Sequence, residues 1–257
     1  MKYNLLSDGK VNHKIKKNIK LGYNTYSLNF AHSDLSGFNV CPIANKLTEQ
    51  ENSPKKSNCS SCCVGYNGFA SIHNSVMESR IKKTLSYFLD RKSFLNQLIY
   101  EIGKAIKESN KKGLKPSFRL NAYSDIKWER EYITDNKNIF QLFPDVDFYD
   151  YTKLSNRNTP VNYQLTYSHY GKFTDTSKAL NNGLNVAIVF EKLPEYIKIN
   201  GKKYTVINGD ETDLRIDEKI NGDNVIVGLK FKGSKKKLQD AIMEGFAIAK
   251  NNKALKY

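Results

Sequence analysis

The sequence predicts a single α/β domain over residues 1–257, a TIM-barrel-like or partial (β/α) barrel with an N-terminal cysteine-rich metal-site loop at 38–66. Two observations support this prediction. Short strand-like segments alternate with helical periodicity, which is typical of parallel strands joined by right-handed crossovers. The segment Leu184–Phe190 is almost continuously apolar, as expected of a strand that is covered on both faces.

The expected elements follow in order. Leu21–Phe30 alternates aromatic and polar residues and predicts a strand. Apolar residues at helical spacing predict helices within Ser71–Leu89 and from Phe94 to a stop at Gly113. Further along we expect strands at 118–123, 146–151, 163–168, 184–190 and 225–229, helices at 126–143, 174–180 and 238–249, and a hairpin at 196–208. The C-terminal part, 195–233, is richer in strands than in helices.

The composition indicates a folded, strongly basic protein. The chain is 39% hydrophobic and has a formal net charge of +15. Such a charge favours a polyanionic partner, in the first place nucleic acid. The alternative is a lysine-rich composition without functional meaning. The polar first ten residues and the lack of a long apolar run predict no signal peptide, no membrane contact and a reducing cytoplasm.

Four cysteines gather near the N-terminus, and none occurs in the rest of the chain: Cys41, Cys59, Cys62 and Cys63. Thiolates at such short spacing suit Zn²⁺ or, alternatively, an iron–sulfur cluster. Adjacent cysteines rarely bind one ion, so we expect Cys41, Cys59 and either Cys62 or Cys63. His73, His32 or an exchangeable group would complete the site. A disulfide and inert buried thiols are the alternatives.

Polar residues follow the expected parallel strands, where ligands of α/β sheets bind. We predict Asp125 and Asp150 as catalytic carboxylates in a shared groove. The predicted substrate-binding residues are Asn121, Ser124, Lys153, Gln164, Ser168 and His169. The alternatives are structural: Asp125 as a helix N-cap, Asp150 paired with Lys153 or Arg119, and His169 as a loop residue.

A second acidic group, Asp210, Glu211 and Asp213, follows the hairpin. Oxygen-rich loops of this kind bind Mg²⁺ or Mn²⁺, and a metal-dependent nuclease is one possible use. The alternative is a charged turn in which Arg215 pairs with Asp210 or Asp213. The sequence contains no P-loop, no Rossmann fingerprint and no nucleophile elbow, which disfavours nucleotide hydrolysis and α/β-hydrolase chemistry.

Several blocks, taken in order, resemble the bacteriophage gene product 88 family. They are Cys41-Pro42, Cys59 with Cys63, 119–125, 148–153, 162–168, 208–215 and 225–233, so that the resemblance runs from Gly22 to Gly233. It implies a phage gene expressed in the cytoplasm of an infected bacterium. Val64 stands where the family pattern has a residue like tyrosine after the last cysteine.

By type rather than by motif, the chain is also similar to phage DNA transglycosylases that insert 7-deazaguanine bases. That similarity implies a barrel with an aspartate nucleophile, a second aspartate and a structural zinc, and it favours DNA over RNA. Our sequence-based hypothesis is therefore a guanine transglycosylase acting on DNA. The alternatives are an iron–sulfur, radical-type enzyme and a non-enzymatic, zinc-stabilised nucleic-acid-binding protein.

Overall fold

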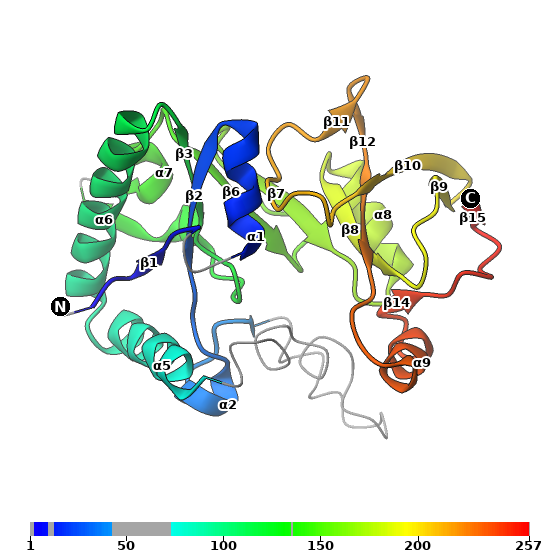
Figure 1. The fold of residues 1–257 in the computed structure, drawn as a ribbon, viewed down its shortest axis with the longest axis horizontal. Coiled ribbons are helices and arrows are strands. Elements are labelled where there is room, and N and C mark those ends of the chain that lie inside the picture. The colour runs from blue at the N-terminus through cyan, green and yellow to red at the C-terminus, as the bar shows by residue number, and fades with distance from the viewer. Residues whose placement is uncertain (1–2, 10–12, 43–72, 135, 257) are drawn as a thin grey trace.

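The computed structural model describes residues 3–9, 13–42, 73–134 and 136–256. Eleven strands of this part form one sheet. They are β1 (Leu6–Ser7), β2 (Tyr23–Leu28), β3 (Lys115–Arg119), β6 (Asp147–Thr152), β7 (Tyr163–Ser168), β8 (Asn185–Phe190), β9 (Tyr196–Ile199), β10 (Lys202–Asn208), β13 (Ile226–Lys230), β14 (Ala247–Ile248) and β15 (Leu255–Lys256). Their order is β1-β2-β3-β6-β7-β8-β13-β10-β9-β15, with β14 paired to β8 (Figure 1).

The strands from β2 to β10 in this order are all parallel to their neighbours. The outer strands β1, β9 and β15 pair antiparallel. A mixed α/β structure around a single sheet is thus confirmed. Among the described residues the strand order is an open path from β1 to β15, and no pairing closes it into a barrel.

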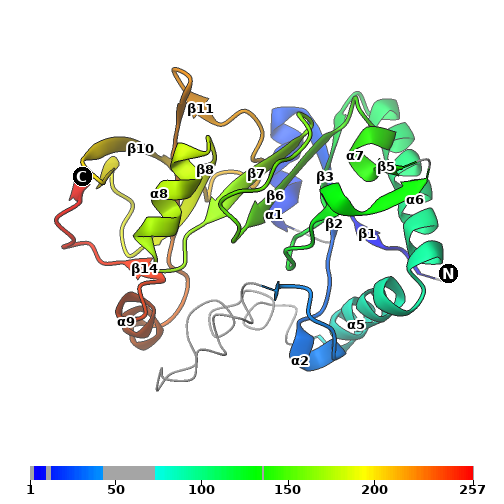
Figure 2. The ribbon, with the colours of Figure 1, turned by 180° about the vertical axis from the view of Figure 1, so that it is seen from behind.

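Helices lie between several of the strands. They are α1 (His13–Lys16), η1 (Lys17–Leu21), α2 (Ser33–Ser36), α5 (Asn74–Leu89), α6 (Arg91–Lys111), η3 (Trp128–Arg130), α7 (Ile139–Leu142), α8 (Phe173–Asn181) and α9 (Lys235–Met243). In Figure 1, α1 lies in front of the strands, and in Figure 2, seen from behind, α8 lies in front of them. The two helices therefore cover opposite faces of the sheet. None of the helices in the described ranges is long and apolar enough to cross a bilayer.

One face of the sheet is apolar and packs against α6 and α7. Strand register aligns Tyr26, Phe118, Phe148 and Tyr163 in a row across four strands. The rings of Tyr26 and Phe118 stack with centroids 5.5 Å apart, and those of Phe118 and Phe148 with centroids 5.4 Å apart. Such aromatic pairs stabilise the sheet beyond the area they bury.

The other face of the same strands is polar, because successive side chains point to opposite faces. It presents Ser117 and Arg119 from β3 and Tyr149 from β6, all of them buried. Asn18 of η1 covers this face, donating hydrogen bonds to Thr25 (2.8 Å) and Tyr149 (3.1 Å). The polar face is thus an internal, hydrogen-bonded layer.

The predicted helix at 126–143 is wrong. The structure has η3, a small hairpin of β4 (Tyr132–Thr134) and β5 (Lys137–Asn138), and then α7. Asn136 has a positive φ of 57°, which a helix does not allow. Asn138 instead begins α7 with a capping box closed by Gln141.

The last predicted helix also ends earlier than expected. α9 stops at Met243, and Gly245 follows with a φ of 73°. The chain then forms β14 and β15, whose short lengths leave little periodicity for a sequence pattern to reveal. A further small hairpin, β11 (Lys219–Ile220) with β12 (Asp223–Asn224), precedes β13.

Candidate functional site

The carboxyl edge of β3, β6 and β7 gathers most of the predicted site residues. Asp150, at 0% exposure, links two of these strands. Its Oδ1 accepts a hydrogen bond from the amide of Asn121 (2.9 Å), and its Oδ2 accepts from the amide of Leu120 (3.1 Å) and the hydroxyl of Tyr163 (3.2 Å). Burial raises the pKa of Asp150 to about 7, against the opposing effect of Arg119.

Asn121 and Ser124 shape the turn that follows β3. The Asn121 Oδ1 accepts from Ser124 Oγ (2.7 Å) and from the amide of Ile126 (3.0 Å). The side-chain Nδ2 of Asn121 donates to the carbonyl of Ile126 (2.9 Å) and to the hydroxyl of Tyr163 (3.2 Å). Both side chains are therefore engaged in holding the loop that carries Asp125.

Asp125 joins that turn to the end of β6. Its Oδ1 accepts from Thr152 Oγ1 (2.9 Å) and Arg157 Nη1 (3.0 Å), and its Oδ2 accepts from the amide of Lys153 (2.8 Å). Burial raises the pKa of Asp125, while the Lys153 amide and Arg157 oppose the rise. Asp125 does not cap a regular helix, because the segment after it is not helical until η3.

Arg157 is a central residue of this site that the sequence did not single out. Its side chain is 2% exposed and binds Asp125 at one side and Glu129 at the other, with Nη2–Oε2 at 2.5 Å and Nε–Oε1 at 3.0 Å. It lies in the irregular segment between β6 and β7, where no periodicity marks a buried position. Asp125 and Asp150 lie at the same edge of the sheet. Asn121 links them, because its backbone amide binds Asp150 and its side chain holds the turn that carries Asp125.

Lys153, Ser168 and His169 form a second group at the same edge. The Lys153 ammonium donates to Ser168 Oγ (2.7 Å), to the Ser168 carbonyl (2.9 Å) and to the His169 carbonyl (3.3 Å). His169 is 3% exposed and contacts Thr176 through Nδ1 (2.7 Å), while its Nε2 accepts from the amide of Gly171 (3.2 Å). Burial lowers the pKa of His169 to about 4, so the ring is neutral at pH 7.

Gln164 does not join these residues. It is the second residue of β7, near the amino end of the strand, and it contacts Asp217. Its Oε1 accepts from the Asp217 amide (2.8 Å), and its Nε2 donates to Asp217 Oδ1 (3.1 Å). The structure therefore gives Gln164 a contact on the polar face rather than at the carboxyl edge.

Cys41 lies beside the turn that carries Asp125. Its Sγ is 3.6 Å from the carbonyl oxygen of Tyr123, and the amide of Asp125 donates to the carbonyl of Val40 (2.8 Å). Cys59, Cys62 and Cys63 lie outside the described residues. Within the described ranges, His, Cys, Asp and Glu side chains form no group of three or more that could hold a metal ion.

The acidic segment at 210–213 is distributed over separate contacts. Asp213 pairs with Arg119 on the polar face, and Asp210 pairs with Lys232 at 2.6 Å. Arg215 pairs with Glu218 at 2.6 Å rather than with either expected aspartate. The charged-turn interpretation therefore describes this segment better than a cation site does.

The polar face holds a buried network around Arg119, which is 8% exposed. Its guanidinium pairs with Asp213 and lies 5.2 Å from the ring centroid of Tyr151. Among the described residues, the Nε of Arg119 has no hydrogen-bond partner, and it is 4.0 Å from Asp150 Oδ1. The hydroxyl of Tyr151 in turn accepts a hydrogen bond from Arg215 Nε (2.7 Å). Tyr151 therefore contacts both arginines of this layer, Arg119 through its ring and Arg215 through its hydroxyl.

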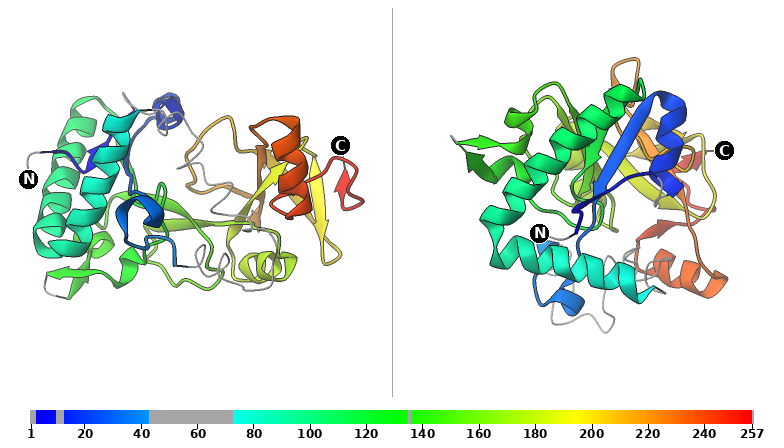
Figure 3. Two further views of the ribbon diagram at one scale, coloured as in Figure 1. Left: turned by 90° about the horizontal axis from the view of Figure 1, so that it is seen from below. Right: turned by 60° about the vertical axis from the view of Figure 1, so that its left-hand side comes forward.

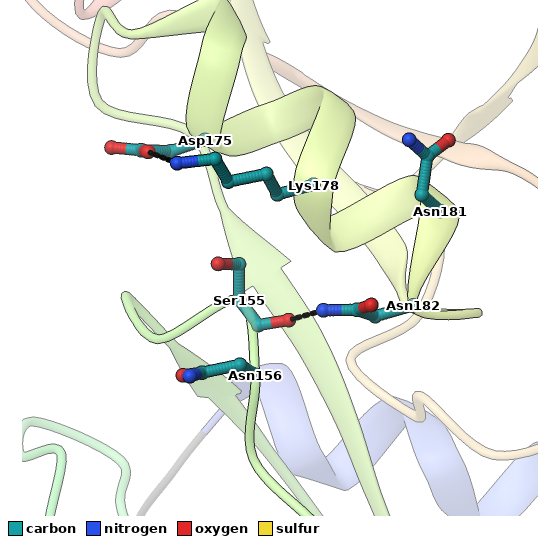
Figure 4. A pocket seen from close by; sticks show the side chains of 6 residues that line it. All are labelled: Ser155, Asn156, Asp175, Lys178, Asn181 and Asn182. Atoms are coloured by element: carbon teal, nitrogen blue, oxygen red, sulfur yellow. Dashed lines mark hydrogen bonds and ion pairs between the residues drawn. The ribbon is translucent and has the colours of Figure 1, made fainter.

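A surface hollow of about 390 Å³ lies between α8 and the segment after β6. Figure 4 shows its lining of polar side chains, with Asp175 and Lys178 paired at 3.7 Å and Asn182 donating to the Ser155 carbonyl. One of its lining residues, Asn156, directly precedes Arg157, which binds Asp125.

A family model described as Gene product 88 matches residues 3–250. The chain belongs to the Gene product 88 family. This confirms the resemblance that the sequence blocks indicated, whereas the similarity to transglycosylases gains no support. Neither the curated proteins nor the solved structures contain a significant match to this chain.

Proposed function

We propose that this Gene product 88 protein is a nucleic-acid-modifying enzyme whose reaction centre lies at the carboxyl edge of the parallel sheet, beside a metal centre held by its cysteines. The attachment of Cys41 to this edge, through Tyr123 and Asp125, is the observation that supports the proposal. Ligands of parallel α/β sheets bind beyond this edge. A metal held there would lie close to substrate, which favours a role in the reaction.

Three thiolates fit the cysteine pattern best, because Cys62 and Cys63 are adjacent. A metal ion or cluster held by three thiolates keeps one coordination position open for an exchangeable ligand. His32 is a poor fourth ligand, since its Nδ1 accepts from the amide of Asp34 (3.3 Å) and caps α2. Catalytic zinc sites commonly include histidine or carboxylate ligands, so the all-sulfur set favours an iron–sulfur cluster, with Zn²⁺ as the second candidate.

When bound, a cluster supplies one-electron chemistry at this edge. The protein's own groups would position substrate there. The Lys153 ammonium, half-buried and held by Ser168 and the His169 carbonyl, contributes positive charge at this edge, which attracts a phosphate. A basic surface, with a net charge of +15, favours nucleic acid as the substrate.

Base exchange with an aspartate nucleophile receives less support. Asp125 is 7% exposed and Asp150 0%, and both oxygens of each carboxylate already accept hydrogen bonds inside the protein. A nucleophile must reach the substrate. In the proposed function, both aspartates are therefore positioning residues that fix the edge next to Cys41.

The test is metal analysis and an optical spectrum of protein purified without oxygen. We expect iron and sulfide together with visible absorption, and loss of both in Cys41→Ala. Cys62→Ala and Cys63→Ala, compared with each other, will show which of the adjacent pair is a ligand. Zinc without colour would select the second candidate, and the absence of any metal would contradict the proposal.

The nucleic-acid part of the proposal needs a separate measurement. DNA incubated with reduced, metal-loaded protein is digested to nucleosides and analysed by mass spectrometry for a changed base. Cys41→Ala protein is the matched control, because its sheet is expected to remain folded. Unchanged nucleosides with both DNA and RNA would refute nucleic-acid modification even if the metal is present.

A further inference from the structure

One segment carries the densest positive charge of the described chain. Residues 230–237, called here the lysine segment, contain no acidic residue and five lysines: Lys230, Lys232, Lys235, Lys236 and Lys237. All five are exposed. Lys232 pairs with Asp210, whereas the three consecutive lysines that begin α9 make no ion pair with any described residue.

These charges are not explained by the packing of α9. Only Ala241 of this helix is buried, and Met243 is 69% exposed. Three neighbouring ammonium groups repel one another, and among the described residues no carboxylate lies within ion-pair distance of them; Asp240, one turn further along α9, pairs with none of the three. A concentration of uncompensated positive charge lowers its free energy when a polyanion binds and releases its counterions.

The lysine segment lies at the functional edge of the sheet. It begins at Lys230, the last residue of β13, whose direction is parallel to that of β8 and β7. Figure 1 shows α9 at the same edge as α2, the helix that precedes Cys41. A polyanion bound by the lysine segment would therefore lie along the edge that carries Asp125 and Lys153.

We propose that the lysine segment binds the phosphate backbone of DNA and holds it along the carboxyl edge. The inference rests on the proposed function for the presence of a reaction centre at that edge. It adds the surface that binds the substrate and the chemical group that this surface recognises. Phosphate contacts fix position without reading sequence, so the segment would bind DNA regardless of base composition.

The chain offers a matched control for charge. Lys107, Lys111 and Lys112 are equally exposed, at the C-terminal end of α6. This end of α6 leads into the amino end of β3, opposite the carboxyl edge. Figure 3 shows α6 and α9 at opposite ends of the molecule.

The experiment compares K235Q/K236Q/K237Q with K107Q/K111Q/K112Q. Binding of each full-length protein to a fluorescent DNA duplex is measured by anisotropy over a series of salt concentrations. Each lost phosphate contact reduces the slope of log K against log salt by about 0.9, so we expect the first variant to lose about 2 to 3 units of slope and to bind more than about tenfold more weakly. The control variant should retain both slope and affinity.

Equal losses in the two variants, or none in the first, would overturn the proposal. Retained DNA binding with lost binding to vesicles of phosphatidylcholine and phosphatidylserine would overturn it in favour of a membrane surface. Iron, sulfide and zinc content should be unchanged in both variants. Failure of the lysine segment is thus distinguished from failure of the metal centre, which Cys41→Ala tests on its own.

Discussion

Replacing Arg157 by methionine removes the cation that joins two buried carboxylates. Arg157 binds Asp125 Oδ1 at 3.0 Å and both oxygens of Glu129, and its side chain is 2% exposed. Methionine keeps much of the apolar stem, so the change acts mainly on charge. Removing one partner of a buried ion pair costs about 3–5 kcal/mol, and we expect the free energy of unfolding to fall by that amount.

The loss should fall unequally on the two carboxylates. Asp125 keeps its hydrogen bonds from Thr152 and from the Lys153 amide, whereas the carboxylate of Glu129 loses the two it accepts from Arg157. The double variant R157M/E129Q should therefore recover about 2 kcal/mol of the stability lost by R157M.

Urea denaturation, followed by the fluorescence of Trp128, measures these changes. Trp128 is the only tryptophan of the chain, is fully buried and directly precedes Glu129. The control is Arg91→Met, which breaks the more exposed pair with Glu131 (3.1 Å, Arg91 side chain 45% exposed) and should cost less than about 1 kcal/mol. Equal effects of R157M and R91M, or no recovery in the double variant, would refute the reasoning.

Three further outcomes are expected. Because burial raises the pKa of Asp150 to about 7, folding favours its protonated form, and the stability from this group is lost as pH rises from about 4 to about 7; the melting temperature of Asp150→Asn should not show this fall. Burial lowers the pKa of His169 to about 4, so the wild-type protein loses stability as pH falls from about 6.5 to about 4. The His169→Gln variant has no such group, and the difference between its free energy of unfolding and that of wild type, measured by urea titration, should become smaller over this range. Gly228→Ala places a Cβ 2.6 Å from Val206 Cγ1 and should destabilise by about 1–3 kcal/mol in thermal melts, whereas Gly103→Ala, in open space on α6, should not destabilise.

Local patterns were sufficient to predict most of the parallel strands. The segment at 163–168 and the apolar run at 184–190 coincide with β7 and β8. The alternation in 21–30 contains β2. In these segments the position of each strand in the sheet determines which side chains are apolar, so the pattern of apolar residues is visible in the sequence. The helix expected at 126–143 was wrong because two asparagines impose a turn and a cap that override its apolar spacing.

The site was harder to predict, since its contacts join distant segments. Asp150 lies within β6 and Asp125 in the loop after β3 rather than at the strand ends themselves, and their partners decide what they do. Arg157 comes from an irregular loop, and Arg119 reaches Asp213, which lies 94 residues away in the sequence. Gln164 lies on a correctly predicted strand yet near its opposite end. Strand position alone does not reveal which residues meet.

The position of β13 has a consequence for how the chain is made. β13 pairs with β8 on one side and β10 on the other, although β9 and β10 are synthesised before it. On the ribosome, β8 therefore presents an unpaired edge while residues 191–225 emerge, and the hairpin of β9 and β10 cannot settle beside it without occupying the place of β13. Exposed strand edges invite pairing with other chains. Closure of the gap between β8 and β10 thus waits for β13, and a truncation before Ile226 would release a protein prone to aggregate.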